Sequence, residues 1–539
     1  MQLYDLPNDV LALILGRLLE EADTSGDAKA SFNLAAINQR LRQVVLPLVY
    51  REVFVQLPAT RHFRSRPDTT RARNRPTEEA AAKTNAGLAA SAHCAGLVRR
   101  VLITFIRFSE GADEVGAAVA ALREASTLWP AVQTLEVAGA RGDYQVSKSD
   151  TLSMPTRVPA VHQLLVAMLP NVQQLFIGGQ VELDPVRTLF HSVTESYQGR
   201  LKTVQVTYTP SPNHQRLHMI QHQNAASPPR PDLLLPRIDA SGLVRLHLEN
   251  AHPEHSWASF GADSSSRSIE FPALQHLRLG YERYSDLDKP TAIKRRPQLH
   301  FPRLDTLQLD CDTDSCPFLD NAVFLRGVER VQLGGPPELF TAVLPIVLPV
   351  AKTLALRICG SDDNQAASLP PINDLLAGAN QCEITRLHLR WVCPPAAIKG
   401  ALAMWLTDLS LSQTISIDDM FELVGRLPRL ARIMVNCSDC QAPRTDISLP
   451  KPGGRGHPIQ PLSKSVKRLA LQDVGAGRWN ARRSNLLKYI LLKLPSLAVL
   501  AANGAEHFRV ERFYTQHRPW YPHLATVKLV SELNRYLEA

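Results

Sequence analysis

The chain has 539 residues, of which 45% are hydrophobic and 21% charged, and it carries a formal net charge of +9. A chain of this length is too long for one hydrophobic core, and this composition is too apolar for an intrinsically disordered protein. The charge excess is compatible with nucleic acid, an acidic protein surface or anionic lipid as a partner, although it also serves solubility alone.

Neither a membrane span nor a disulfide framework is predicted. The most apolar window, TAVLPIVLPVAKTLAL, is interrupted by Pro345, Pro349 and Lys352 before it reaches the ~20 apolar residues that a spanning helix needs. The N-terminus lacks the basic region of a secretory signal. Eight cysteines in a chain of this length fit scattered, reduced thiols. We therefore expect a soluble, intracellular protein of the cytoplasm or nucleus that has no membrane partner.

The first segment in chain order is a pair of amphipathic helices. In DLPNDVLALILGRLLE apolar residues recur at helical spacing, with Asp5 placed to cap the helix and Pro7 in its first turn. A polar break, EADTSGDAKA, separates this stretch from FNLAAINQRLRQVV, whose apolar residues keep the helical period until Pro47 ends it.

This opening, Leu-Pro-x-Asp-Val-Leu-x-x-Ile-x-x-x-Leu with Arg-Leu-Arg and Pro-Leu-Val-Tyr further on, resembles the F-box. The F-box is a three-helix motif that docks on the Skp-family adaptor of cullin-RING ubiquitin ligases. The resemblance assigns residues 1–57 to this motif. The residues that it implies for adaptor binding or the motif core are Leu6, Pro7, Val10, Leu11, Ile14, Leu18, Leu34, Leu41 and Val45. Leu41 stands where many F-boxes have tryptophan, and the loop before the second helix is enlarged. The alternative is a helical pair that caps the repeats described below.

Residues 58–92 are expected to connect this motif to the rest of the chain. The stretch RHFRSRPDTTRARNRP contains six arginines and two prolines. Dense arginine can bind phosphates or act as a nuclear address, and a flexible linker is the plainer interpretation. The alanine-rich EEAAAKTNAGLAASAH after it predicts a helix.

A repeat runs through residues 93–539. Copies such as LPNVQQLFI, FPALQHLRL, FPRLDTLQL and LPRLARIMV share three aliphatic residues at the spacing Leu-x-x-Leu-x-Leu, with Val or Ile in place of Leu in some, and relaxed copies such as GLVRLHL lack the leading proline. The central aliphatic residues of fifteen copies, about 30 residues apart on average, are Val101, Leu135, Leu175, Val204, Leu246, Leu277, Leu307, Val331, Leu354, Leu387, Leu409, Ile433, Leu469, Leu500 and Val527. Two aliphatics spaced two apart put their side chains on one face of a strand, and a unit this small must stack on its neighbours to bury that face.

The pattern resembles the leucine-rich-repeat solenoid, which implies an α/β fold with a parallel strand ladder and helices or loops behind it. Stretches between copies, such as NAVFLRGVER and RRSNLLKYILLKL, have a helical pattern. Most copies lack the asparagine or cysteine that usually follows the strand in this family. The alternative is an ordinary α/β domain with several buried strands.

The residues that flank the core aliphatics are expected to point to the concave surface of such a solenoid. Those that make its middle basic, and that we treat as candidate substrate-binding residues, are Arg245, His247, Arg278, Arg330, Arg357, Arg386, His388, Arg390, Arg432 and Arg468, with His276 beside them. Glu249, Asp310 and Asp408 oppose them. Because guanidinium groups pair with carboxylates and phosphates, an acidic or phosphorylated protein segment is the predicted ligand, and a solvated charged face is the alternative.

No motif of an enzyme is present: the sequence has no Walker loop, no G-x-G-x-x-G after a strand, no H-E-x-x-H and no G-x-S-x-G. Cys437 and Cys440 have zinc-like spacing, but the other close pair, Cys311 and Cys316, is five repeats away, so no shared metal site is expected. No cofactor and no catalytic residue is predicted.

An F-box followed by leucine-rich repeats implies a substrate receptor, a non-catalytic subunit of an SCF-type ubiquitin ligase. Its partners would be a Skp-family adaptor, cullin through that adaptor, and a target protein. The alternatives are a non-ligase interaction scaffold and a basic solenoid that binds nucleic acid. The last is disfavoured because Phe176 is the only aromatic residue found among the predicted concave positions to stack on bases.

Overall fold

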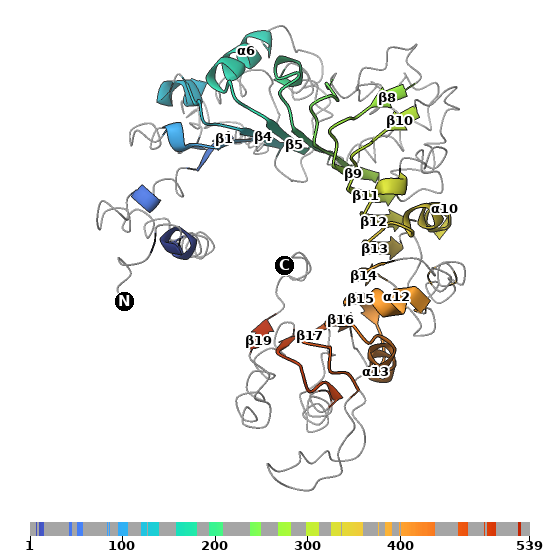
Figure 1. Ribbon diagram of the computed structural model, residues 1–539. Helices are drawn as coiled ribbons and strands as arrows, with labels where there is room; N and C mark the ends of the chain where they lie inside the picture. The colour runs from blue at the N-terminus through green and yellow to red at the C-terminus, as the bar shows by residue number, and fades with distance from the viewer. Residues whose placement is uncertain are drawn as a thin grey trace, which may run out of the picture. The chain divides into compact units, whose positions relative to one another are not determined.

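The computed structural model of the protein is an α/β structure dominated by parallel strands (Figure 1). It describes residues 7, 10–15, 43–45, 51–57, 83–84, 86, 95–105, 120–126, 128–139, 158–179, 193–208, 238–249, 268–281, 298–311, 325–335, 337–358, 374, 376, 383–390, 398, 400–436, 462–472, 490, 493–502 and 526–529. The chain divides into two units, Met1–Pro302 and Arg303–Ala539, each of which is described by itself.

In the first unit, the described residues form one run of parallel strands that follows chain order. The strands of this run are β1 (Glu52–Leu57), β3 (Arg100–Phe105), β4 (Thr134–Gly139), β5 (Gln174–Gly179), β6 (Thr203–Tyr208), β7 (Arg245–Glu249) and β9 (His276–Tyr281). Strand β2 (Lys83–Thr84) pairs antiparallel with β1, and β8 (Ser268–Glu270) pairs in parallel with β10 (Gln298–His300). The labelled helical segments are the 3-10 turn η2 (Ala95–Leu97) and α6 (Val158–Met168).

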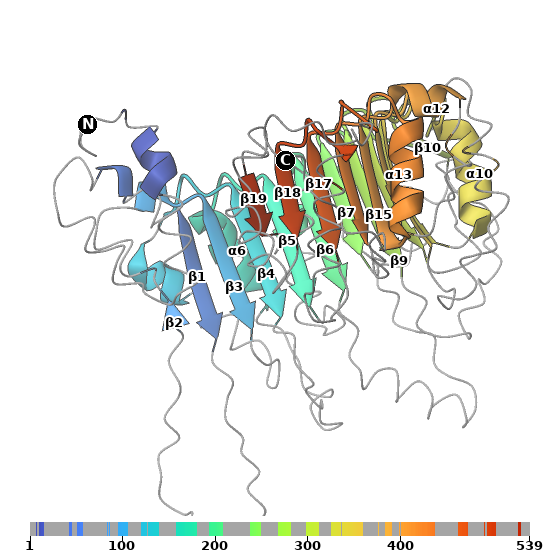
Figure 2. The same ribbon diagram turned by 90° about the horizontal axis from the view of Figure 1, so that it is seen from below.

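The second unit repeats this arrangement, again with every strand parallel to the next. Its strands are β11 (Thr306–Cys311), β12 (Arg330–Gly335), β13 (Thr353–Ile358), β14 (Arg386–Leu389), β15 (Asp408–Thr414), β16 (Arg432–Asn436), β17 (Arg468–Gln472), β18 (Val499–Ala502) and β19 (Thr526–Leu529). Its labelled helices are α10 (Pro337–Val347), α12 (Gly400–Trp405) and α13 (Ile417–Arg426). In Figure 2 the arrows of β17, β18 and β19 point in the same direction.

The predicted parallel strand ladder is confirmed. Each of the fifteen central aliphatics lies on a strand, and within each unit they pair with one another, as Leu354 does with Leu387 and Leu387 with Leu409. Where burial is described, these side chains are nearly inaccessible to water. Stacked aliphatic rows of this kind give the sheet one continuous apolar face, which accounts for the recurrence of the pattern.

The helices of each unit cover that apolar face. Figure 1 shows α6 on one face of the first unit's sheet, and α10, α12 and α13 on one face of the second unit's sheet. Helix α13 illustrates the local causes: Ser416 caps it by accepting a hydrogen bond from the Asp419 amide (3.1 Å), and Arg426 closes its last turn. Its buried side chains include Met420 and Leu423.

Most strands are anchored where they begin by a repeated backbone contact. The carbonyl oxygen of the residue just before one strand accepts hydrogen bonds from two consecutive amides at the start of the next strand. Thr385 O, for example, accepts from Thr407 N (2.9 Å) and Asp408 N (3.0 Å), and Thr407 O accepts from Ala431 N (2.8 Å) and Arg432 N (3.0 Å). These contacts satisfy polar groups at the entry to each strand without a side chain.

Strand β1 adds one strand to the ladder, before the strand of the first predicted copy. Val53 pairs with Val101, so β1 continues the apolar row inside residues 1–57, the stretch that the resemblance assigned to a three-helix F-box. The described residues of that stretch are helical only at 10–15 and 43–45, so they do not show a three-helix motif. Its sequence, YREVFV, has tyrosine where the other copies have leucine or another aliphatic residue, which concealed the repeat. Because β1 would otherwise leave main-chain groups open on its far side, β2 pairs there.

Two expected helices differ in the described residues. The alanine-rich stretch was expected to be helical, but its residues Lys83–Thr84 form β2. In NAVFLRGVER, residues 325–327 form a single 3-10 turn and β12 begins at Arg330. The end of that stretch is a strand because Arg330 pairs with Thr306 and Thr353 on the neighbouring strands. In RRSNLLKYILLKL only positions 490, 493 and 494 fall within the described residues.

Within the part of the chain that the structure describes, every helix falls short of the length and apolarity that crossing a membrane requires. The same residues contain no group of three His, Cys, Asp or Glu side chains placed to hold a metal ion. Of the four cysteines that lie close in sequence as two pairs, only Cys311, the last residue of β11, lies in the described part.

Candidate functional site

The candidate binding surface is the face of each sheet that carries the residues flanking the core aliphatics. We call it the helix-free face. In β7, for example, Leu246 and Leu248 are buried, whereas Arg245 is exposed and His247 and Glu249 are partly exposed. The alternation follows from the two-residue period of a strand, and it places all ten predicted substrate-binding residues on or at the end of strands.

In the first unit, the predicted residues of β7 and β9 lie together around a carboxylate. Arg278 Nη2 is 3.7 Å from Glu249 Oε1, and His247 Nε2 is 3.4 Å from Glu249 Oε2, although the latter contact lacks hydrogen-bond geometry. The side chain of Glu249 passes close to Gly280, where an added Cβ would lie 3.3 Å from Glu249 Cγ. Much of the positive charge expected here is therefore neutralised within the protein.

The two predicted histidines add no positive charge at neutral pH. Burial, together with the charge of Arg278, lowers the pKa of His247 from 6.5 to about 4. Burial and the charge of Arg390 lower the pKa of His388 to about 4 in the same way. Both imidazoles are therefore neutral at pH 7, so these two histidines do not contribute to the basic character of the face.

In the second unit, four arginines occupy one register position of the sheet. They are Arg330 on β12, Arg386 on β14, Arg432 on β16 and Arg468 on β17, and we call them the arginine row. Thr353 takes the same position on β13, and Asp408 takes it on β15. Arginine therefore recurs on alternate strands from β12 to β16.

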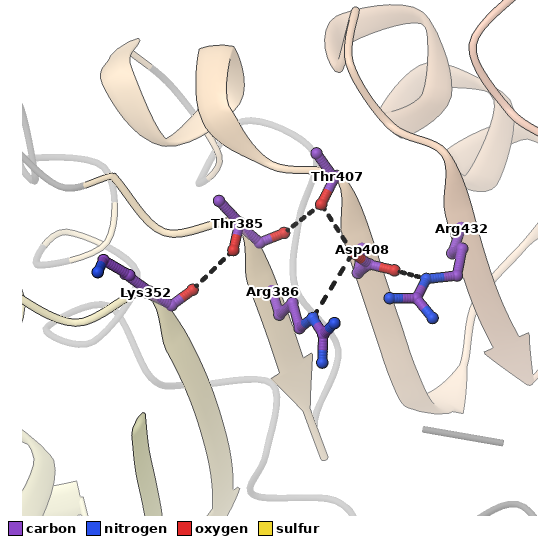
Figure 3. Close-up of polar contacts among 6 residues, drawn as sticks. All are labelled: Lys352, Thr385, Arg386, Thr407, Asp408 and Arg432. Carbon is purple, nitrogen blue, oxygen red and sulfur yellow. Dashed lines mark hydrogen bonds and ion pairs between the residues drawn. The ribbon is translucent and has the colours of Figure 1, made fainter. Parts of the chain in front are cut away.

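Asp408 divides the arginine row (Figure 3). Its carboxylate pairs with Arg432 Nε on one side and lies 4.0 Å from Arg386 Nε on the other. The hydroxyl of Thr407 is 2.7 Å from Asp408 Oδ2 and 3.0 Å from Thr385 O, which fixes the carboxylate at the start of β15. Both contacts lie at Nε, and the one with Arg432 is a hydrogen bond. The Asp408 carboxylate therefore orients the Arg432 guanidinium group without occupying its terminal nitrogens.

A second ion pair lies near the C-terminal ends of the strands, whereas the contacts of Asp408 lie where the strands begin. Arg357 on β13 pairs with Asp310 on β11, although β12 lies between the two strands. The intervening residue is Gly334, and a Cβ there would overlap Asp310 Oδ1 and lie 3.3 Å from Arg357 Nε. The absence of a side chain at Gly334 therefore lets this pair form.

The remaining predicted arginines differ in their partners. Arg330 Nη2 lies 3.5 Å from Asp305 Oδ2. Among the described residues, Arg245, Arg390 and Arg468 have no carboxylate within ion-pair distance. The helix-free face of the second unit is thus basic, and its charge is partly compensated by Asp305, Asp310 and Asp408.

Ser410 is a residue of this face that the sequence did not single out. It lies between His388 and Met434 in the register and is only 3% exposed. Its hydroxyl has no hydrogen-bond partner in the structure as described. A serine between two leucines is an ordinary exposed strand position in sequence, so its burial could not be anticipated.

The candidate adaptor-binding residues fall into three groups: buried residues, exposed or partly exposed residues, and residues outside the described part of the chain. Residues 10–15 are helical, and the Leu11 amide donates to Pro7 O (2.9 Å), which extends the helical hydrogen bonding to Pro7. Leu11 and Val45 are fully buried, whereas Pro7 and Val10 are exposed and Ile14 is partly exposed. The candidates outside the described residues are Leu6, Leu18, Leu34 and Leu41.

Leu13, which was not among the candidates, is 70% exposed. With Val10 and Ile14 it gives the helix an exposed apolar side at spacings of three and four residues, opposite buried Leu11 and Leu15.

No model of a known protein family matches the sequence, and no curated protein matches it.

Proposed function

We propose that this chain is the substrate-recognition subunit of an SCF-type ubiquitin ligase. The N-terminal helices would form an F-box that binds a Skp-family adaptor, and through it cullin. The repeats would form a leucine-rich-repeat solenoid, and its helix-free face would bind the target protein. The chain would have no catalytic role, because ubiquitin transfer belongs to its partners.

The observation that carries the proposal is the division of the helix at residues 10–15 into two apolar sides. Leu11 and Leu15 are buried, as the core of a small helical motif requires. Val10 and Leu13 are 36% and 70% exposed, although both are apolar. A helix that only capped the repeats would bury its apolar residues, whereas a helix that docks on another protein presents some of them to its partner.

The helix-free face supports the other half of the proposal. Within each unit its strands are in register, so side chains from distant parts of the sequence form continuous rows on a rigid support. Arginine is enriched in protein interfaces because its planar fork binds carboxylates while its stem contributes apolar contact. An acidic segment of a target protein is therefore the expected ligand of the second unit.

The test is capture of the full chain by an immobilised Skp-family adaptor. We compare the wild type with the double variant Val10→Asp, Leu13→Asp, which charges the exposed apolar side and leaves the buried side intact. The matched control is Leu128→Asp, Leu164→Asp, which charges two other exposed leucines of the first unit.

The proposal predicts capture of the wild type and the control, with the loss of most binding in the Val10, Leu13 variant. Failure of the adaptor to capture the wild-type chain would refute the ligase role and favour an interaction scaffold. Equal capture of all three proteins would show that this helix is not the docking surface.

A further inference from the structure

The arginine row has a spacing that limits which ligand it can bind. Arg330, Arg386 and Arg432 share one register position on β12, β14 and β16, so one strand separates each from the next. Neighbouring strands lie about 4.8 Å apart, which puts successive arginines of this set about 9.6 Å apart. Arg468 on β17 lies beside Arg432 and reinforces one end.

The arginines of this set keep hydrogen-bond donors available. The side chains of Arg330 and Arg386 are 61% and 50% exposed. Asp408 pairs with Arg432 through Nε and lies 4.0 Å from Arg386 Nε (Figure 3). Among the described residues, no ion pair involves a terminal nitrogen of either side chain, although the Arg432 side chain is only 25% exposed. Asp305 approaches one terminal nitrogen of Arg330 at 3.5 Å, which leaves the other. A guanidinium group held by Nε can still bind an incoming carboxylate through its terminal donors.

Among regular peptide conformations, polyproline II matches this spacing best. It has three residues per turn and a rise of about 3.1 Å, so every third side chain points the same way, about 9.3 Å from the last. Side chains on one face of a β-strand are about 6.7 Å apart. In an α-helix residues seven apart are separated by about 10.5 Å. Three such residues span about 21 Å, about 2 Å more than the distance from Arg330 to Arg432.

Asp408 sharpens the requirement. It occupies the row midway between Arg386 and Arg432, on the intervening strand. A ligand with carboxylates at closer intervals would place one against Asp408, and like charges at short distance repel. The row therefore favours acidic residues at wide, regular intervals over a continuous acidic run.

We propose that the arginine row binds a target segment in the polyproline II conformation that crosses the strands. The segment carries a carboxylate at every third residue, one each for Arg330, Arg386 and Arg432. This inference rests on the proposed function for the role of the helix-free face as the target-binding surface, and it specifies the chemistry of the target.

Fluorescence anisotropy with labelled peptides and the full-length chain tests the proposal. The first probe has four Glu-Pro-Pro repeats, and the second has the same composition with all its glutamates contiguous. A third probe replaces glutamate by lysine in the first, and a fourth is a helical peptide with glutamates seven residues apart. We expect the first probe to bind at least about fivefold more tightly than any other, and increasing salt to weaken its binding. Binding of the contiguous or helical probe that equals or exceeds that of the first would overturn the proposal.

Variants locate the site. Arg330→Gln, Arg386→Gln removes two exposed charges of the row, and Arg326→Gln, Arg426→Gln is the matched control because it removes two exposed arginines of the same unit that lie outside the row. We expect the double variant to lose about tenfold or more in affinity for the first probe, and the control to lose less than twofold. Circular dichroism verifies that both variants are folded.

Equal affinity of wild type and double variant would place binding elsewhere and refute the proposal. Because no adaptor is present in this assay, its outcome is separate from that of the adaptor capture: either can fail while the other succeeds.

Discussion

Replacing Gly334 by alanine tests whether the helix-free face is packed as the structure shows. The new Cβ would overlap Asp310 Oδ1 and lie 3.0 Å from Asp310 Cγ. The Asp310 side chain must rotate away, and its ion pair with Arg357 is then lost. Because both side chains are partly exposed, the pair contributes at most about 1 kcal/mol, and an off-rotamer Asp310 costs about 0.5–1.5 kcal/mol.

The net effect includes an opposing term. Alanine in place of glycine reduces the conformational freedom of the unfolded chain, which stabilises a protein by about 0.4–1 kcal/mol when the native backbone accepts it. The expected result for Gly334→Ala is therefore a loss of about 1 kcal/mol, with an upper limit of about 2 kcal/mol. Gly178→Ala is the matched control, since Gly178 holds the equivalent position on β5 and a Cβ there has no neighbour within 4 Å. We expect that control to be neutral or slightly stabilising.

Gly280→Ala is the intermediate case, because its Cβ would lie 3.3 Å from Glu249 Cγ. Urea denaturation followed by circular dichroism measures the free energy of unfolding of all three variants. We expect Gly178→Ala to be the most stable, Gly280→Ala to be intermediate and Gly334→Ala to be the least stable. In an Asp310→Ala background the penalty of Gly334→Ala should largely disappear, since the overlapping atoms are gone. Equal effects of the three variants, or a penalty that persists in that background, would refute the packing described for this face.

Three further predictions concern stability. Tyr197 is fully buried and its hydroxyl donates to Leu169 O (2.8 Å), so Tyr197→Phe should cost about 1–2 kcal/mol in urea denaturation; no loss would contradict this bond. The pKa values of His247 and His388 are lowered from 6.5 to about 4, so the unfolded chain binds protons that the native chain does not. Thermal stability should therefore fall as the pH drops from about 6.5 to about 4, and replacing both histidines by glutamine should reduce that slope; an unchanged slope would show that they do not cause it. Ser410→Ala removes a buried hydroxyl without a described partner, so it should leave the melting temperature unchanged or raise it, whereas a drop of several degrees would reveal a hydrogen bond to Ser410.

The sequence by itself determined where the strands of the repeat lie and how they align. Within each copy, the spacing of two residues determines which two aliphatic side chains share a face, because side chains alternate along a strand. Stacking identical units leaves one register that buries every aliphatic, so the pairing of Leu354 with Leu387 followed from the pattern. Strand β1 escaped detection because Tyr50 replaces the leading aliphatic residue.

Only the tertiary structure decided the electrostatics of the helix-free face. Asp408 meets Arg432 24 positions away, and Asp310 meets Arg357 47 positions away across an intervening strand. Such partners depend on which strands are neighbours and on whether a glycine such as Gly334 leaves room between them. The neutral state of His388 likewise depends on burial by residues distant in sequence. A strand pattern is a local property of the chain, whereas the surroundings of a charge are assembled by its packing, so the first could be predicted and the second had to be observed.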